Sequence, residues 1–128
     1  MIIDSSVVVA IVCREPGFEE LVEQLQNAGA IGIGTPTATE ARIVLQARLG
    51  CDGRALLERF LHDFEIEVVA FGEPHWREAV DAHRRFGKGR HPAALNFGDC
   101  MSYATAAVQA QPLMFIGKDF SKTDLPPA

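Results

Sequence analysis

The chain opens with Met1-Ile2-Ile3-Asp4-Ser5-Ser6, a short apolar run that ends at a carboxylate followed by two hydroxyl side chains. This pattern predicts a buried strand over residues 1–4 that leads directly into a helix over 7–13, capped by one of the two serines, Ser5 or Ser6. A carboxylate at the end of a central strand lies next to buried sheet, where an unpaired charge is costly. Asp4 is therefore the first candidate functional residue.

The rest of the chain repeats this alternation of strand and helix. Short apolar runs predict further strands over 30–34, 66–71 and 113–116. Apolar residues at helical spacing predict helices from 18 to near 29 and over 35–49, 52–61, 74–83 and 99–110. Strands separated by helices imply right-handed crossovers and a mainly parallel sheet. The expected fold class is α/β, with helices on both faces of the sheet in a single domain over residues 1–128.

Composition supports one globular domain, since 48% of the 128 residues are apolar and the net charge is −5. No stretch approaches the roughly 20 apolar residues that span a bilayer, and a strand at the first residue leaves no room for a signal peptide. We therefore expect a cytoplasmic protein without a membrane segment. Three widely separated cysteines fit neither a zinc site nor a disulfide framework and are expected to fill the core.

Four acidic residues follow predicted strands or begin predicted helices: Asp4, Glu40, Asp99 and Asp119. The carboxyl ends of parallel strands meet at one edge of a sheet, so these side chains are expected to gather there. Carboxylates without cationic partners repel one another, and a divalent cation relieves that repulsion. No His or Cys lies at zinc-ligand spacing, so the expected ion is Mg²⁺, with Mn²⁺ as a substitute. Such a site predicts hydrolysis of a phosphodiester by a metal-bound water.

Each acid also has a structural explanation that the sequence leaves open, and that of Asp4 is the weakest. Thr37-x-x-Glu40 matches a capping box, in which Glu40 reaches back to the N-cap amide. Asp99 is suited to be the N-cap of its own helix, and Asp119 to cap the turn that follows the last strand. The prediction of a site therefore depends on all four acids lying at the same edge.

Residues 83–91, the basic strip, contain four of the twelve Lys and Arg residues and no acid. These cations are Arg84, Arg85, Lys88 and Arg90. A basic strip on an acidic protein is typical of a track for a polyanion such as RNA. Cations at the C-terminus of a helix also complement its dipole, which is the alternative explanation.

Several ordered blocks resemble the PIN-domain ribonucleases, and especially the VapC toxins of bacterial type II toxin–antitoxin systems. The resemblance extends from residue 1 to about 125, and the segment Arg85–His91 is typical of one VapC subgroup. The matching blocks are Met1–Ser6, Thr39–Ala41, Leu95–Cys100 and Gly117–Phe120, followed by Thr123-Asp124.

This resemblance implies a three-layer α/β/α PIN-like fold and an Mg²⁺-dependent endoribonuclease that cuts RNA in loops of tRNA or rRNA. It also implies a homodimer and a cognate VapB-like antitoxin whose tail occupies the active-site groove. By motif position the catalytic residues are Asp4, Glu40, Asp99 and Asp119, of which Asp4, Asp99 and Asp119 are the metal ligands. Glu40 is expected to act through a water or a second metal, while Ser6 and Asn96 support the site by hydrogen bonds.

One departure and two alternatives accompany the resemblance. Lys118 precedes Asp119 where family members often have an acid or Asn, and a cation there would compete with the metal. A phosphoacceptor receiver domain is disfavoured, because two serines rather than a second acid follow Asp4. A non-catalytic PIN-like module that binds RNA or a partner is the remaining alternative.

Overall fold

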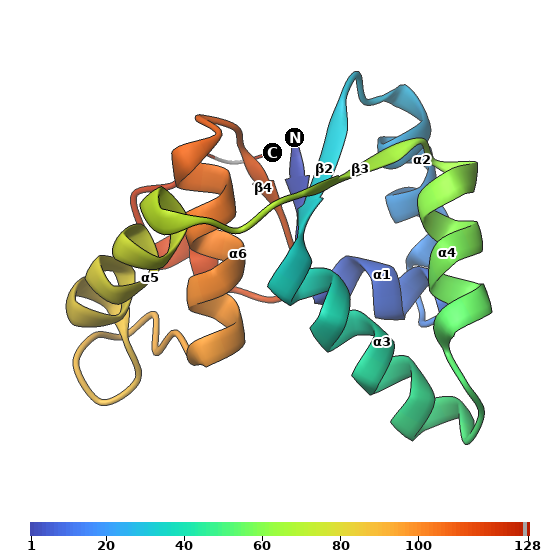
Figure 1. Cartoon of the computed structure of the whole chain (residues 1–128), viewed down its shortest axis with the longest axis horizontal. Coiled ribbons are helices and arrows are strands. Elements are labelled where there is room, and N and C mark those ends of the chain that lie inside the picture. The colour runs from blue at the N-terminus through green and yellow to red at the C-terminus, as the bar shows by residue number, and fades with distance from the viewer. Residues whose placement is uncertain (127) are drawn as a thin grey trace.

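The computed structural model describes residues 1–126 and 128, in which four parallel strands form one sheet in the order β3-β2-β1-β4. The strands are β1 (Ile2–Ile3), β2 (Ile31–Gly34), β3 (Ile66–Val69) and β4 (Leu113–Met114). The first strand thus lies inside the sheet, paired with β2 on one side and with β4, the last strand, on the other (Figure 1). The predicted parallel sheet is confirmed.

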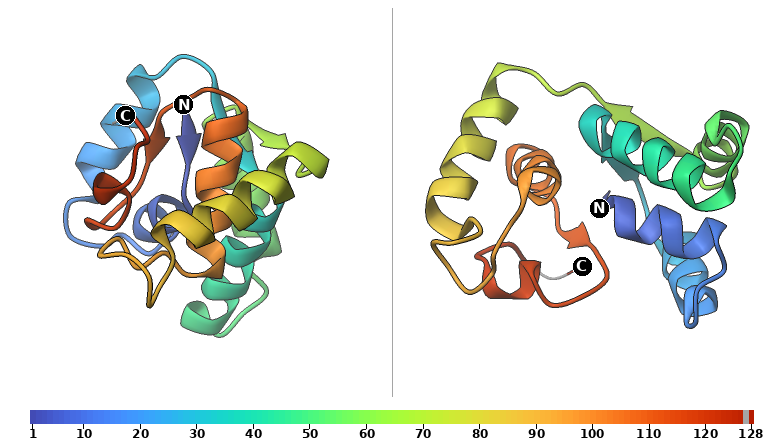
Figure 2. Two further views of the ribbon diagram at one scale, coloured as in Figure 1. Left: turned by 90° about the vertical axis from the view of Figure 1, so that its left-hand side faces the viewer. Right: turned by 90° about the horizontal axis from the view of Figure 1, so that it is seen from below.

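Helices cover both faces of the sheet and complete three layers (Figure 2). One face carries α1 (Ser5–Val12), α2 (Phe18–Asn27), α3 (Thr35–Leu49) and α4 (Arg54–Asp63). The other face carries α5 (Glu73–Phe86) and α6 (Phe97–Val108), and a short 3-10 helix, η1 (Phe120–Lys122), follows β4. This arrangement confirms the predicted α/β/α fold class. No described helix has the length and apolar character needed to cross a membrane.

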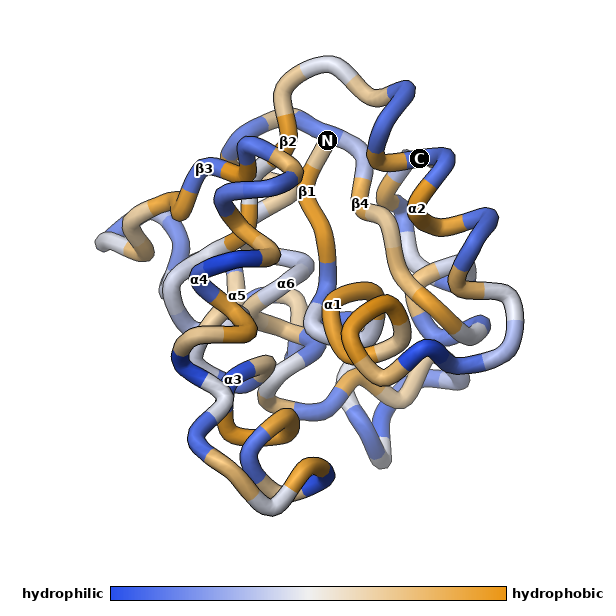
Figure 3. The backbone as a smooth tube through the Cα atoms, turned by 90° about the vertical axis from the view of Figure 1, so that its right-hand side faces the viewer, coloured by the Kyte–Doolittle hydropathy of each residue, from blue (hydrophilic) through white to orange (hydrophobic). Residues whose placement is uncertain are grey.

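The two faces of the sheet bury separate hydrophobic cores, because successive side chains of a strand point to opposite faces. Ile3 and Met114 pack toward α1–α4, whereas Ile2 and Leu113 pack toward α5 and α6. Helix α1 is hydrophobic along nearly its whole length (Figure 3) and buries the β-branched run Val7–Val9. Burying each such side chain contributes about 1.5–3 kcal/mol, more than the helix-propensity penalty of below about 1 kcal/mol.

Two strands are shorter than predicted because their partners end early. The strand expected over 66–71 ends at Val69, which pairs with Gly34, the last residue of β2. The strand expected over 113–116 ends at Met114, which pairs with Ile3, the last residue of β1. In both cases the neighbouring strand has already passed into a helix.

Several helices start differently from the prediction; α4 begins at Arg54 instead of 52, and α5 at Glu73 instead of 74. Asp4, rather than Ser5 or Ser6, is the N-cap of α1, because its carboxylate accepts a hydrogen bond from the backbone N–H of Ser6. Helix α6 begins at Phe97 instead of 99, because Asn96 provides its N-cap. The prediction that all three cysteines fill the core was wrong for Cys51, which is exposed.

Candidate active site

Asp4 lies at the carboxyl end of β1, with only 6% of its surface exposed. Its Oδ2 accepts the backbone N–H of Ser6 at 3.1 Å, and its Oδ1 accepts the hydroxyl of Ser102 at 2.5 Å. Ser6 also joins two elements of this edge, since its Oγ accepts the backbone N–H of Ile116, just after β4, at 3.1 Å. The aspartate that caps α1 is therefore also a candidate metal ligand.

Glu40 enters the site from the second turn of α3. Its Oε1 accepts the Ser5 hydroxyl at 2.6 Å, and a Cβ added to Gly98 would lie 2.2 Å from its Oε2. The carboxylate of Glu40 is therefore wedged between the first turns of α1 and α6. The capping-box interpretation of Thr37 and Glu40 was wrong, because α3 already begins at Thr35 and the Thr37 side chain is buried inside its first turn.

Asp99 occupies the first turn of α6 and forms a reciprocal capping box with Asn96. Asp99 N–H donates to Asn96 Oδ1 at 2.8 Å, and Asn96 N–H donates to Asp99 Oδ2 at 3.0 Å. Asn96, not Asp99, is thus the N-cap of this helix. This pairing engages one carboxylate oxygen of Asp99 and fixes the direction in which the other points.

The pKa of Asp99 responds to the charges of the other three acids. Burial is the main cause that raises the pKa of Asp99 to about 6, against the opposing hydrogen bond from Asn96. The remaining increase comes, in decreasing order, from the negative charges of Asp4, Asp119 and Glu40. Three negative charges that raise the pKa of Asp99 are not offset there by a positive charge.

Asp119 is the most exposed of the four acids and lies in the turn that leads into η1. Its carboxylate makes no side-chain cap hydrogen bond to that short helix. Within residues 1–126 and 128, no ion pair joins Lys118 to Asp119 or to any other acid. The competition expected from Lys118 is therefore not realised as a salt bridge.

The donor set fits a hard divalent cation in its chemistry. It consists of carboxylates with neighbouring hydroxyl and amide oxygens, and no described cationic side chain pairs with any of the four acids. In the part of the chain that the structure describes, however, no three His, Cys, Asp or Glu side chains converge closely enough to enclose an ion. Hydrogen bonds from Ser5, Ser102 and Asn96 hold the carboxylates of Glu40, Asp4 and Asp99 in their present orientations.

Comparison with known proteins identifies the family. The sequence model of the PIN domain matches residues 1–125. Ribonuclease VapC36 of Mycobacterium tuberculosis is 45% identical over 126 residues, covering 98% of this chain and 91% of that protein. Ribonuclease VapC of Mycolicibacterium smegmatis is 41% identical, covering 98% of this chain and 97% of that protein. This chain belongs to the VapC ribonucleases of the PIN-domain family.

Two solved structures share this fold. The crystal structure of Mycobacterium tuberculosis VapC20, a toxin that cleaves the sarcin–ricin loop, superposes with a TM-score of 0.81. It is 13% identical, and the match covers 99% of this chain and 97% of VapC20. A toxin–antitoxin complex from Klebsiella pneumoniae gives a TM-score of 0.71, with 13% identity over 96% of this chain and 92% of that one. At such low identity these likenesses show the fold alone.

In the basic strip of this VapC ribonuclease, some cations form ion pairs with carboxylates and others, among the described residues, do not. Arg84 pairs with Asp81 at 2.7 Å on the same helix. Lys88 and Arg90 lie on the exposed loop that follows α5, and no carboxylate among the described residues pairs with either. Backbone hydrogen bonds between Leu95 and residues 86 and 88 hold the two ends of the loop together. The loop therefore presents two unpaired cations to solvent.

Arg85 belongs to a three-residue cluster, the Arg85–Tyr103–Asp124 cluster, that the sequence did not reveal. Its guanidinium donates to Asp124 Oδ2 at 2.7 Å and lies 4.6 Å above the ring of Phe86. The buried Tyr103 donates its hydroxyl to Asp124 Oδ1 at 2.6 Å, which is the main cause that lowers the pKa of Asp124. The cluster ties the segment after η1 to α5 and α6.

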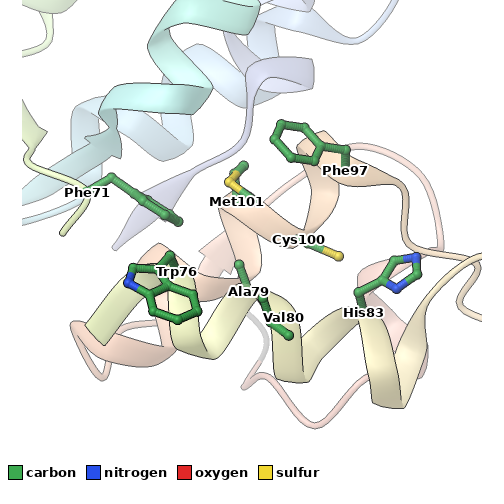
Figure 4. Close-up of a pocket in the computed structure, with 8 residues that line it drawn as sticks. All are labelled: Phe71, Trp76, Ala79, Val80, His83, Phe97, Cys100 and Met101. Atoms are coloured by element: carbon green, nitrogen blue, oxygen red, sulfur yellow. The ribbon is translucent and has the colours of Figure 1, made fainter. Parts of the chain in front are cut away.

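An apolar groove of about 560 Å³ runs between α5 and α6. Figure 4 shows Phe71 and Trp76 at one end and Phe97 and His83 at the other. Burial, and to a lesser extent the charge of Asp99, raises the pKa of the lining Cys100 thiol to about 11, so this cysteine is a neutral side chain and not a nucleophile. None of the four site acids lines the groove, which is a separate surface.

Proposed function

We propose that this VapC ribonuclease is an Mg²⁺-dependent endoribonuclease that hydrolyses RNA phosphodiester bonds, with Mn²⁺ as a substitute cation. The observation that carries the proposal is that the charges of Asp4, Asp119 and Glu40 all act on Asp99, while no described cationic side chain pairs with any of the four acids. A divalent cation at this edge would relieve their repulsion and supply an ionised water for attack on phosphorus. Asp4, Asp99 and Asp119 would hold it.

The surrounding residues have supporting roles in this proposal. Ser5 holds Glu40 at the rim of the site, where its carboxylate acts through a water or a second cation. Asn96 orients Asp99, and Ser6 keeps the segment after β4 beside α1. These contacts keep the carboxylates on rigid helix starts, which lowers the cost of organising them around a ligand.

The substrate proposal follows from the charge distribution near the site. Lys88 and Arg90 are exposed and unpaired among the described side chains, and cations of this kind bind RNA phosphates without regard to sequence. Bases in single-stranded loops are open to recognition, so loops of tRNA or rRNA in the cytoplasm are the proposed targets. Arg84 and Arg85 are held by carboxylates and are expected to contribute less.

The proposed biological role is that of the toxic component of a type II toxin–antitoxin system, inhibited by a VapB-like antitoxin. The proposed assembly is a homodimer formed through the α5–α6 groove. Phe97, Val80 and Trp76 are 79%, 61% and 49% exposed there, and contiguous apolar surface of this kind marks protein interfaces. Val80→Glu should shift the sedimentation of the protein from dimer to monomer.

The proposed activity is tested with purified protein free of antitoxin, incubated with total RNA in Mg²⁺ or in EDTA. Asp4→Asn and Asp99→Asn remove a charge while keeping a side-chain oxygen that accepts the backbone hydrogen bond at each helix start, so the fold should persist and cleavage should fall to background. Glu19→Gln, an exposed acid on α2, serves as the matched control. RNA that is bound but not cut by the wild type would instead favour the non-catalytic module.

A further inference from the structure

Two buried hydroxyl groups, those of Ser102 and Thr37, form a hydrogen-bonded chain that ends at Asp4. The proposed chemistry does not use them. Ser102 Oγ on α6 is 2.5 Å from Asp4 Oδ1, and Thr37 Oγ1 on α3 is 3.2 Å from Ser102 Oγ. Ser102 is completely buried, Thr37 is 2% exposed and Asp4 is 6% exposed. Three elements from distant parts of the chain therefore meet in a polar contact within an otherwise apolar interior.

The direction of the hydrogen bonds in this chain of hydroxyl groups follows from the terminal acceptor, the Asp4 carboxylate. The carboxylate of Asp4 only accepts, so Ser102 donates its single hydroxyl proton to Asp4. Ser102 then has only lone pairs for its second partner, so Thr37 donates to Ser102. A hydroxyl that itself accepts a hydrogen bond is polarised and donates more strongly, especially to a charged oxygen.

The hydrogen-bonded chain helps to fix the orientation of the Asp4 carboxylate. Oδ1 is held by Ser102 and Oδ2 by the backbone N–H of Ser6, so rotation of the group would break at least one bond. Each oxygen retains a second lone pair for another ligand, because an ionised carboxylate offers about four acceptor sites. Water does not reach the fully buried Ser102 to replace its hydroxyl.

We propose that Ser102, supported by Thr37, is a positioning residue that orients Asp4 for the divalent cation and so sets the affinity of the site. The inference rests on the proposed metal-dependent function and deepens it. Side chains that orient metal ligands typically change metal affinity by about 10- to 100-fold when they are removed. Ser102 touches neither the cation nor the RNA in this proposal and acts only through Asp4.

The experiment measures Mn²⁺ binding to the full chain by calorimetry, alongside the Mn²⁺ concentration that gives half-maximal RNA cleavage. Ser102→Ala should weaken Mn²⁺ binding about 10-fold or more, and saturating Mn²⁺ should restore most of the cleavage rate. Thr105→Ala is the matched control, because Thr105 is equally buried one turn along α6 but donates to the Met101 carbonyl. It should bind Mn²⁺ like the wild type.

Substitutions of Thr37 keep the test decisive if Ser102→Ala folds poorly. Thr37→Val keeps the shape without the hydroxyl and should weaken Mn²⁺ binding, whereas Thr37→Ser keeps the hydroxyl and should restore it. Wild-type affinity in Ser102→Ala, or an equal loss in Thr105→Ala, would overturn the inference while leaving the proposed function intact. Absence of Mn²⁺ binding by the wild type would overturn both.

Discussion

The Ser5 hydroxyl donates a 2.6 Å hydrogen bond to Oε1 of Glu40 and so links the first turn of α1 to α3. Hydrogen bonds to charged acceptors contribute more than neutral ones, so Ser5→Ala should lower the free energy of unfolding by about 1–2 kcal/mol. RNA cleavage should also fall, because Glu40 loses the contact that holds it at the rim of the site. Urea unfolding and a cleavage assay measure the two effects.

Thr39→Ala is the control for this prediction. The Thr39 hydroxyl bonds only to the Thr35 carbonyl on the exposed side of the same helix. Its removal should change stability by no more than about 0.5 kcal/mol. Equal effects of the Ser5 and Thr39 substitutions would mean that the link to Glu40 has no special importance.

Gly98 leaves room for the Glu40 carboxylate at the start of α6, and Gly98→Ala should displace that carboxylate. The added Cβ would lie 2.2 Å from Glu40 Oε2, so the end of this side chain would have to move and give up its hydrogen bond from Ser5. Ala favours the helix over Gly by roughly 0.5–1 kcal/mol, which offsets part of that loss, so the protein should still fold. Cleavage, however, should drop at least as far as in Glu40→Ala.

The double substitution Glu40→Ala with Gly98→Ala separates the two contributions. With the carboxylate removed, the added methyl group has no clash, and Gly98→Ala should then raise the melting temperature relative to Glu40→Ala alone. Thermal unfolding of the wild type, the two single variants and the double variant measures the coupling between Glu40 and Gly98. A melting temperature that falls equally in both backgrounds would show that Gly98 is required for another reason.

The protonation of Asp99 makes stability depend on pH in a defined window. Its pKa is about 6 in the folded protein and near 3.8 in the unfolded chain, so the folded state binds the proton more tightly. The resulting stabilisation is complete below about pH 3.8 and is lost as the pH rises through 6. In EDTA, acidification from pH 7 to 5 should therefore raise the melting temperature relative to Asp99→Asn.

A bound cation should remove this effect, because it favours the ionised carboxylate. With Mg²⁺ present, the difference in pH dependence between the wild type and Asp99→Asn should disappear or change sign. The pKa values of Asp124 and Asp81 are lowered, so their stabilisation is lost only at a pH below the range from 7 to 5. They therefore do not obscure the effect of Asp99. Identical pH profiles of the two proteins in EDTA would contradict the assignment.

The cations of the basic strip should differ in their effect on RNA binding. Replacing Lys88 and Arg90 with Ala should weaken RNA binding and reduce the salt dependence by about two counterions. Arg85→Ala should instead lower stability, because it breaks the contact with Asp124 that joins α5 to the end of the chain. Filter binding at several salt concentrations, with unfolding curves for each variant, distinguishes these outcomes.

Much of the fold was predictable because its periodic signals agree with its tertiary structure. The apolar run before Asp4 and the helical spacing after Thr35 specify elements that the structure confirms within a few residues. Strand ends were less predictable, because Val69 and Met114 end their strands only where the partner strand ends. The end of each strand is set by its pairing with a segment far away in the sequence, and the local sequence carries no signal for that pairing.

The four acids were predictable from topology, whereas the contacts that hold them were not. Strand ends share an edge, so Asp4 and Asp99 were expected to approach each other. The Ser102 hydroxyl reaches Asp4 from 98 residues away, and only its place as a polar side chain in a helix of small and apolar residues hinted at a role. Asp124 was noted only as part of the last matching block, yet its carboxylate binds Tyr103 and Arg85 on two different helices.

The order of the strands also constrains when the nuclease becomes active during its synthesis. Asp4 is translated first, but β1 is completed on one side only when β4 pairs with it, and Asp119 follows β4. A nascent chain that has not yet released β4 from the ribosome therefore lacks both a neighbour of the central strand and one of the four acids. The central strand and the proposed site are therefore completed at the same stage of synthesis, after β4 has been made.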